Sequence, residues 1–214
     1  MTKRIFIGVC NSQDFVPAEF FWSMLGQVDF VAKPEFGRAK HPWDVCRNNQ
    51  LIDGFLNSGC DYFAKTDIDQ KYPVDYFKTL VPLVDQYKVI GPVIYDRWRG
   101  PGFIPLAFRN KMITRENMFP LPRDGSIVDV PYSHTNLIYA REVLEKIPRP
   151  WYEAYATDDG LGRKNHVDYT FLDKIRNAGY PIYIHTGVVV GHLTTQPIDQ
   201  EFYDTWHRGH KEVL

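Results

Sequence analysis

Two aspartates one residue apart, Asp67 and Asp69, follow the apolar, β-prone run at residues 62–66. If that run is a strand, residues i and i+2 share a face, so both carboxylates leave its carboxyl end on one side. Ligands of open α/β sheets bind outside the carboxyl ends of the strands. Mg²⁺ is commonly bound there by one or two carboxylates together with substrate phosphates. We therefore predict a cation site at this pair; the alternatives are a shared proton or a solvated turn.

The composition is that of a folded chain without a strong electrostatic bias. With 214 residues and a net charge of −1, the chain is long enough for a sizeable core and has no general attraction for nucleic acid or membranes. Three widely spaced cysteines include no Cys-x-x-Cys pair, which fits a reducing compartment. The first apolar run is too short for a signal peptide, and no segment approaches a membrane span. We expect a soluble cytoplasmic protein.

Strand and helix patterns alternate in the first half of the chain. Buried strands are expected at residues 5–9, 28–32, 62–66 and 89–95, and helices at 17–25, 43–57 and 73–87, the last kinked near Pro82. Residues 33–41 are expected to form a basic loop. This order predicts an α/β fold with a mostly parallel central sheet flanked by helices, in which Asp67 and Asp69 follow an inner strand.

The second half is less regular. Residues 97–123 are rich in proline, glycine and arginine, which predicts an irregular excursion of the kind that forms a substrate wall or lid. Short strands are expected at 129–131 and 136–139, helices at 141–147 and 167–177, and further strands at 180–185 and 188–191. His192 follows the last of these strands directly, so we expect its side chain near a sheet edge.

Four sequence blocks between residues 5 and 193 are informative when they are taken together. They are the strand at 5–9, Cys46-Arg47-Asn48-Asn49 before an amphipathic helix, Thr66-Asp67-Ile68-Asp69, and the ending Val167-Asp168-Tyr169-Thr170-Phe171, Ala178-Gly179-Tyr180 and Val190-Gly191-His192-Leu193. Together they resemble the GT-A glycosyltransferases, in particular the short family-2-like enzymes of phages and bacteria. The resemblance implies one continuous Rossmann-like domain, with residues 1–95 as the nucleotide-sugar-binding half and residues 96–214 as the acceptor-binding half.

The resemblance also implies a set of donor-binding residues. Asp69 would ligate a divalent cation, Asp67 would contact the ribose or the metal, and His192 would add a nitrogen ligand, which makes Mn²⁺ as suitable as Mg²⁺. Asn11 and Arg47 are expected to contact the nucleotide; the alternatives are hydrogen bonding within the loop and a surface charge. The expected donor is a nucleotide-sugar, in the first place a UDP-sugar, whose departing pyrophosphate the cation would stabilise.

On the acceptor side, Asp168 is the candidate general base if the reaction inverts the anomeric centre. Its alternative role is to cap the helix that begins beside it. Val167 stands where the family usually has glutamate, so Asp158 and Asp159 are alternative bases. Trp151 resembles an acceptor-side aromatic residue of the family, and its alternative role is in the core.

The acceptor and the function class leave alternatives open. One hypothesis for the acceptor is a hydroxymethylated base in phage DNA, modified in the host cytoplasm, motivated by Lys33, Arg38, Lys40, Arg97 and Arg99; a glycan or a protein is the alternative. A nucleotidyltransferase would also use carboxylates and Mg²⁺, but it usually needs a glycine-rich loop after the first strand, which this chain lacks. A non-catalytic nucleotide- or sugar-binding module is the third possibility.

Overall fold

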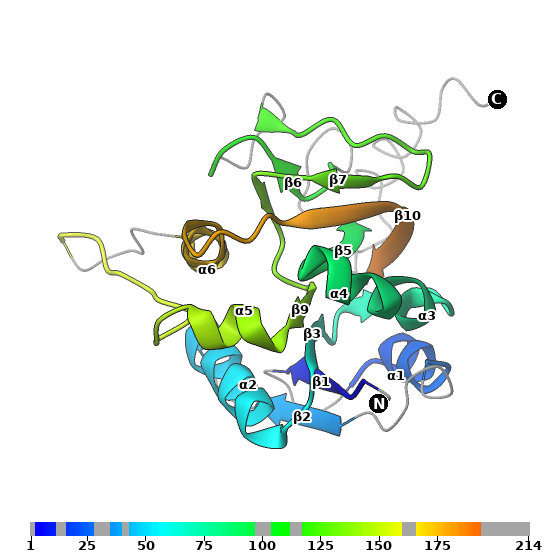
Figure 1. The fold of residues 1–214 in the computed structure, drawn as a ribbon, viewed down its shortest axis with the longest axis horizontal. Coiled ribbons are helices and arrows are strands. Elements are labelled where there is room, and N and C mark those ends of the chain that lie inside the picture. Colours follow the sequence, from blue (N-terminus) through cyan, green and yellow to red (C-terminus); the bar gives the residue numbers. More distant parts are fainter. Residues whose placement is uncertain are drawn as a thin grey trace, which may run out of the picture.

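The computed structural model describes residues 3–11, 16–27, 35–39, 43–96, 104–111, 117–159 and 166–193. A central eight-stranded sheet runs through the molecule in the order β2-β1-β3-β9-β5-β10-β4, and β7 pairs with β10 outside this path (Figure 1). Its strands are β1 (Ile5–Cys10), β2 (Glu35–Ala39), β3 (Tyr62–Asp67), β4 (Gln70–Lys71), β5 (Val89–Ile94), β7 (Ile127–Asp129), β9 (Ile138–Ala140) and β10 (Tyr183–His192). β6 (Ala107–Phe108) and β8 (Tyr132–Ser133) form a separate small sheet.

Helices cover both faces of the large sheet. They are α1 (Ala18–Leu25), α2 (Asp44–Ser58), α3 (Tyr76–Leu80), α4 (Val84–Tyr87), α5 (Arg141–Lys146) and α6 (Val167–Asn177), with the 3-10 turn η2 (Val81–Leu83) between α3 and α4. In Figure 1, α2, α5 and α6 lie on one side of the sheet, and α1, α3 and α4 lie on the other. The kink predicted near Pro82 is confirmed as this 3-10 turn. None of the described helices is long and apolar enough to cross a membrane.

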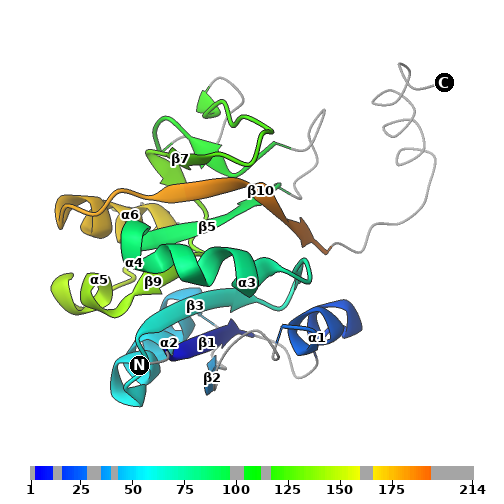
Figure 2. The same cartoon turned by 45° about the vertical axis from the view of Figure 1, so that its right-hand side comes forward.

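Strand direction confirms the predicted sheet and adds one feature to it. β2, β1, β3, β5 and β10 run the same way, so their carboxyl ends meet at one edge. β9 lies between β3 and β5 and is antiparallel to both. Because β9 runs the opposite way, the residues that precede it lie at the carboxyl edge of its neighbours. Figure 2 shows the far end of β10 bending toward the loop after β3, where β4 pairs with it.

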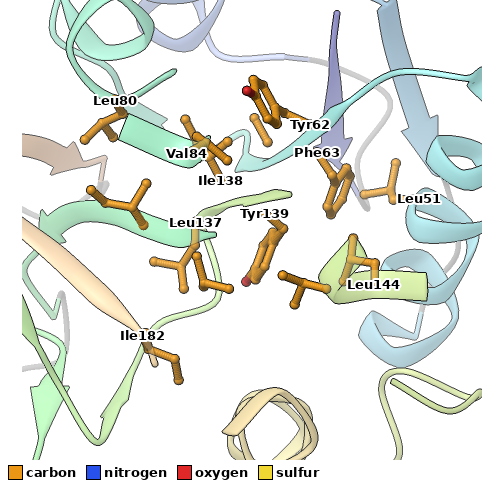
Figure 3. Close-up of a cluster of buried hydrophobic side chains, with 14 of the residues drawn as sticks. Leu51, Tyr62, Phe63, Leu80, Val84, Leu137, Ile138, Tyr139, Leu144 and Ile182 are labelled. Atoms are coloured by element: carbon orange, nitrogen blue, oxygen red, sulfur yellow. The ribbon is translucent and has the colours of Figure 1, made fainter. Parts of the chain in front are cut away.

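Aromatic side chains fix the middle of the sheet. The ring of Phe63 lies 5.5 Å from that of Phe55 on α2 and 6.0 Å from that of Tyr139 on β9. Tyr62 and Ile138 point to the opposite side of the sheet, toward α4 (Figure 3). Each such ring that is fully buried contributes about 2–3 kcal/mol of hydrophobic stabilisation. This packing fixes the two faces of β3, so Phe63 and the residues that follow at two-residue intervals, Lys65 and Asp67, point toward the α2 and α6 side.

Two local predictions were wrong. Residues 35–39 form β2 within the predicted basic loop, because Gly37 lets this strand approach the ring of Phe6: a Cβ there would lie 2.1 Å from the ring. β10 is one strand of ten residues instead of two, since its pairing with β5 continues past a register shift between His185 and Val189. The strand predicted at 28–32 lies outside the described residues, as do residues 97–103 and 112–116 of the excursion.

Candidate functional site

Asp69 and His192 meet at the carboxyl edge of the sheet. Asp69 lies in the turn between β3 and β4, and His192 is the last residue of β10. The short antiparallel pairing of β4 with β10 places His192 opposite Gln70, and Leu193 N donates to Asp69 O at 2.6 Å. These backbone contacts bring His192 Nε2 to 3.5 Å from Asp69 Oδ2. The pair is therefore assembled by sheet register, from residues more than a hundred positions apart in the sequence.

The imidazole of His192 has a defined orientation. Its Nδ1 lies 3.0 Å from the carbonyl oxygen of Tyr95. Since a carbonyl oxygen only accepts hydrogen bonds, we assign the Nδ1 hydrogen to this contact, which turns Nε2 toward the carboxylate of Asp69. A histidine whose second ring nitrogen donates to a carbonyl oxygen has the outer-shell contact that orients metal-binding histidines. The pair thus offers one nitrogen and one carboxylate oxygen to a cation.

Asp67 is engaged by a different set of groups. Lys65 Nζ lies 3.1 Å from Asp67 Oδ1 and 3.3 Å from Oδ2, and Asn136 Nδ2 donates to Oδ2 at 2.7 Å. Lys65 Nζ also donates to Asn136 Oδ1, which closes a triangle of hydrogen bonds. About a third of the Asp67 side chain is exposed, so the carboxylate still faces the open edge of the sheet.

Lys65 is buried within an inner strand. Burial lowers the pKa of its ammonium group, but the Asp67 carboxylate, with a contribution from the Asp168 carboxylate, more than offsets this effect and raises the pKa above its ordinary value. The ammonium is therefore charged at neutral pH. The segment 62–66 was predicted as a strand, yet its alternation gave no reason to assign Lys65 to the site, because a lysine is rarely buried in a sheet.

A polar segment before β9 contacts two carboxylates of the site, those of Asp67 and Asp168. Ser133, His134, Thr135 and Asn136 are all buried. Asn136 bonds Asp67, as described above, and Thr135 Oγ1 donates to Asp168 Oδ1 at 2.9 Å. Consecutive residues therefore hold the two carboxylates. Sequence reasoning placed Asn136 at the start of a strand and missed this role; four polar residues in a row before a buried strand were the available signal.

His134 occupies the centre of that segment. Its Nε2 lies 2.9 Å from the carbonyl oxygen of Pro92, while its Nδ1 has no hydrogen-bond partner among the described residues. Burial lowers the pKa of the ring to about 4; the bond to Pro92 opposes this shift, and the nearby charge of Lys65 adds to it. His134 is therefore neutral at physiological pH.

Asp168, the predicted base, is the second residue of α6. Its carboxylate accepts the hydrogen bond from Thr135, and it lies close enough to Lys65 to raise the pKa of that group. These contacts place Asp168 on the same face of the sheet as Asp67. Asp158 and Asp159, the alternative bases, are both exposed.

The predicted nucleotide contacts lie at the end of β1. Asn11 is fully buried directly after this strand. Arg47, in the first turn of α2, donates from Nε to Cys10 Sγ at 3.3 Å, and Cys10 is paired with Asp67 in the parallel register of β1 and β3. Burial, and then the Asp67 charge, raise the pKa of the Cys10 thiol, so Cys10 is a neutral neighbour of the site. Both Asn11 and Arg47 are therefore at the same edge of the sheet as the aspartates.

Other sequence candidates lie elsewhere. Trp151 is buried and its Nε1 donates to Leu144 O at 3.0 Å, which supports its alternative role in the core. Asn49 bonds both the backbone nitrogen and the carbonyl oxygen of Tyr152, so it anchors the loop after α5. Of the basic residues that suggested DNA, Arg38 is exposed on β2. Lys33, Lys40, Arg97 and Arg99 lie outside the described residues.

The ligands that Asp69 and His192 offer suit a cation whose coordination is completed by the substrate. Across the described ranges, no three His, Cys, Asp or Glu side chains lie close enough to hold a metal ion by themselves. Asp69 and His192 supply two ligands of suitable chemistry, and a divalent cation commonly takes its remaining ligands from phosphate oxygens and water. Asp67 is turned instead to Lys65 and Asn136.

Comparison with known proteins supports the fold. No family model matches the chain, and no curated protein matches its sequence. Among solved structures, A197 from STIV is similar with a TM-score of 0.59 at 16% identity, covering 91% of this chain and 87% of that one. GalNAc-T7, solved with UDP, GalNAc and Mn²⁺, is similar with a TM-score of 0.52 at 11% identity, covering 98% of this chain and 48% of that one. The chain thus has a GT-A-like, Rossmann-type fold and spans about half of GalNAc-T7.

Proposed function

We propose that this protein is a metal-dependent glycosyltransferase. It moves the sugar of a nucleotide-sugar donor, in the first place a UDP-sugar, to an acceptor hydroxyl. The observation that carries the proposal is the Asp69–His192 pair at the carboxyl edge of the sheet, with Asp67 beside it. A fold similar to that of GalNAc-T7, whose structure holds UDP, GalNAc and Mn²⁺, supports this interpretation of the pair.

In this proposal Asp69 and His192 hold the cation. When bound, Mn²⁺ or Mg²⁺ supplies positive charge to the diphosphate as negative charge develops on it. Asp67 accepts hydrogen bonds from the donor, in the first place from ribose hydroxyls. Asn11 and Arg47 are proposed as further nucleotide contacts, because both lie at the end of β1 next to Asp67.

Asp168 is the proposed general base. The acceptor oxygen forms a bond to the anomeric carbon while the bond from that carbon to the diphosphate oxygen breaks. Asp168 takes the proton of the acceptor hydroxyl, and the nucleoside diphosphate leaves. The hydrogen bond from Thr135 would orient the carboxylate for this transfer without neutralising it.

The donor site is tested by incubating a panel of UDP- and GDP-sugars with the protein and measuring the released nucleoside diphosphate, with Mn²⁺ or with EDTA. We expect release from one donor that requires Mn²⁺ and falls by at least about a hundredfold in Asp69→Asn. Asp75→Asn, an exposed aspartate at the start of α3, is the matched control and should keep wild-type release. Metal-independent release, or release unaffected by Asp69→Asn, would contradict the proposal.

Other substrates and readouts separate the alternatives. A nucleotidyltransferase would join the nucleotidyl group of a nucleoside triphosphate to a sugar phosphate and release pyrophosphate from the triphosphate. A non-catalytic module would bind nucleotide-sugar without releasing nucleoside diphosphate. Once the donor is known, acceptors are compared by sugar transfer to duplex DNA with hydroxymethylated bases, to unmodified duplex, to a glycan and to protein. Transfer to the modified duplex alone would establish the DNA-modification hypothesis, and transfer only to a glycan or protein would eliminate it.

A further inference from the structure

The ammonium of Lys65, which belongs to the interior of the sheet, lies 3.1 Å from Asp67 Oδ1. Only 6% of the Lys65 side chain is exposed, and its backbone nitrogen donates to Leu137 O at 3.1 Å, which continues the pairing of β3 with β9. The side chain therefore starts from an inner strand and runs along the face that carries Phe63. Its position is fixed by the sheet, unlike that of a lysine on the surface.

The hydrogen bonds of this ammonium all go to two residues, Asp67 and Asn136. An ammonium has three hydrogens, and Lys65 Nζ directs them to Asp67 Oδ1, Asp67 Oδ2 and Asn136 Oδ1. Asn136 uses its amide group for both partners, since its oxygen accepts from Lys65 and its nitrogen donates to Asp67. These contacts hold the carboxylate from behind, while its partly exposed side faces the edge of the sheet.

Stability alone is a weak reason for this arrangement. A buried ion pair often contributes little to folding, because removing two charges from water costs about as much as their attraction returns. A methionine of similar length would keep much of the packing of the aliphatic part of Lys65, whereas Asp67 and Asn136 would lose the contacts that the ammonium makes. What the ammonium adds is a fixed charge and a fixed orientation for Asp67.

We propose that Lys65 is a positioning residue: with Asn136, it holds the Asp67 carboxylate in the orientation that accepts hydrogen bonds from the nucleotide part of the donor. This inference rests on the proposed function and extends it. It divides the two aspartates by role, because Asp67 is held by an ammonium of the protein and Asp69 faces His192. Nucleotide binding through Asp67 then depends on Lys65 whether or not a metal ion is present.

The test is calorimetric titration of UDP, with EDTA and with Mn²⁺, into wild type, Lys65→Met, Lys65→Arg and Asp69→Asn. Lys65→Met should weaken UDP binding by at least about tenfold in both conditions, since it removes charge-assisted hydrogen bonds to Asp67. Lys65→Arg should recover part of the loss. Asp69→Asn should remove only the gain that Mn²⁺ provides. In turnover, Lys65→Met should raise KM for the donor more than it lowers kcat.

Two further variants separate positioning from a general structural effect. Lys174 pairs with Glu153 at 2.6 Å, and both side chains are largely buried, so Lys174→Met breaks a comparable ion pair away from the site. It should lower the melting temperature without changing UDP affinity. In a double-mutant cycle, Lys65→Met should have little further effect on UDP binding in an Asp67→Asn background, because its partner carboxylate is already gone.

The results distinguish the positioning role of Lys65 from the proposed function. Wild-type UDP affinity in folded Lys65→Met, or equal losses in Lys65→Met with and without the Asp67 carboxylate, would overturn the positioning role and leave the proposed function standing. If Lys65→Met does not fold, Asn136→Ala removes the other contact to Asp67, and unchanged UDP affinity in that variant would overturn the role equally. Wild-type protein that binds neither UDP nor GDP in either condition would overturn the proposed function together with this inference.

Discussion

His134 makes the stability of the protein depend on pH in a window set by its burial. The ring is 8% exposed, and its pKa in the folded protein is about 4, against 6.5 for an ordinary histidine. Between these values the unfolded chain binds a proton at residue 134 and the folded protein does not. Stability is therefore complete above about pH 6.5 and falls as the pH is lowered toward 4, because protonation draws the chain to the unfolded state.

The size of this effect follows from the two pKa values. A difference between 6.5 and about 4 corresponds to about 3 kcal/mol of unfolding free energy, which is a large part of the stability of a typical domain. Lys65, Asp67 and His192 are the charged or titratable groups that act on the ring, and burial has a larger effect on its pKa than any of them. The loss should therefore persist at moderate salt, since burial, unlike surface charge, is not screened.

Urea unfolding at a series of pH values between 7.5 and about 4 measures the effect, with wild type compared to His134→Gln. Glutamine can donate to Pro92 O but does not titrate, so the free-energy difference between the two proteins should change by about 3 kcal/mol across the window. His185→Gln is the control, because His185 is a partly exposed histidine of β10. If wild type and His134→Gln lose stability in parallel as the pH falls, the buried-histidine reasoning is refuted.

Two substitutions test how the segment before β9 supports the site. Thr135→Val removes the hydrogen bond to Asp168; it should cost about 1–2 kcal/mol of unfolding free energy and lower transfer activity. The control Thr186→Val, which removes a partly buried hydrogen bond to Ser126 O, should cost about 1 kcal/mol and leave activity unchanged. Wild-type transfer activity in Thr135→Val would contradict the role of Thr135. Gly91→Ala places a Cβ 2.2 Å from Leu137 Cδ2 and 3.3 Å from its Cα; urea unfolding should show a loss of about 1–3 kcal/mol, and unchanged stability would show that Leu137 can move.

Much of the fold was predictable because its pattern is local. The helices α2 and α6 follow from apolar residues at helical spacing, and β1, β3 and β5 follow from short β-prone runs that are mostly apolar. β2 was not predictable in this way. Its sequence, Glu-Phe-Gly-Arg-Ala, has no β-branched residue, and it is a strand because it pairs with β1 and because Gly37 fits against Phe6.

The site, like the fold, depends partly on local sequence and partly on contacts between segments that are distant in the sequence. Asp67 and Asp69 could be selected from their spacing after a strand, and His192 from its place after another. The contacts that define their roles could not, because they depend on β9 lying antiparallel between β3 and β5. That topology brings Asn136 to Asp67 and Thr135 to Asp168. No pattern within a short window of sequence reports which strand becomes the neighbour of which.

The proposed function requires that Asp69 and His192 hold a divalent cation together with a nucleoside diphosphate. The most direct measurement is the melting temperature of wild type, Asp69→Ala and His192→Ala with UDP alone, Mn²⁺ alone, and both together. A ligand that binds only the folded state raises the melting temperature, so we expect a shift in wild type with UDP and Mn²⁺ together that exceeds the two single shifts added. Both variants should lose this excess. If wild type shows no such excess, or if the variants retain it, Asp69 and His192 do not hold a cation together with UDP.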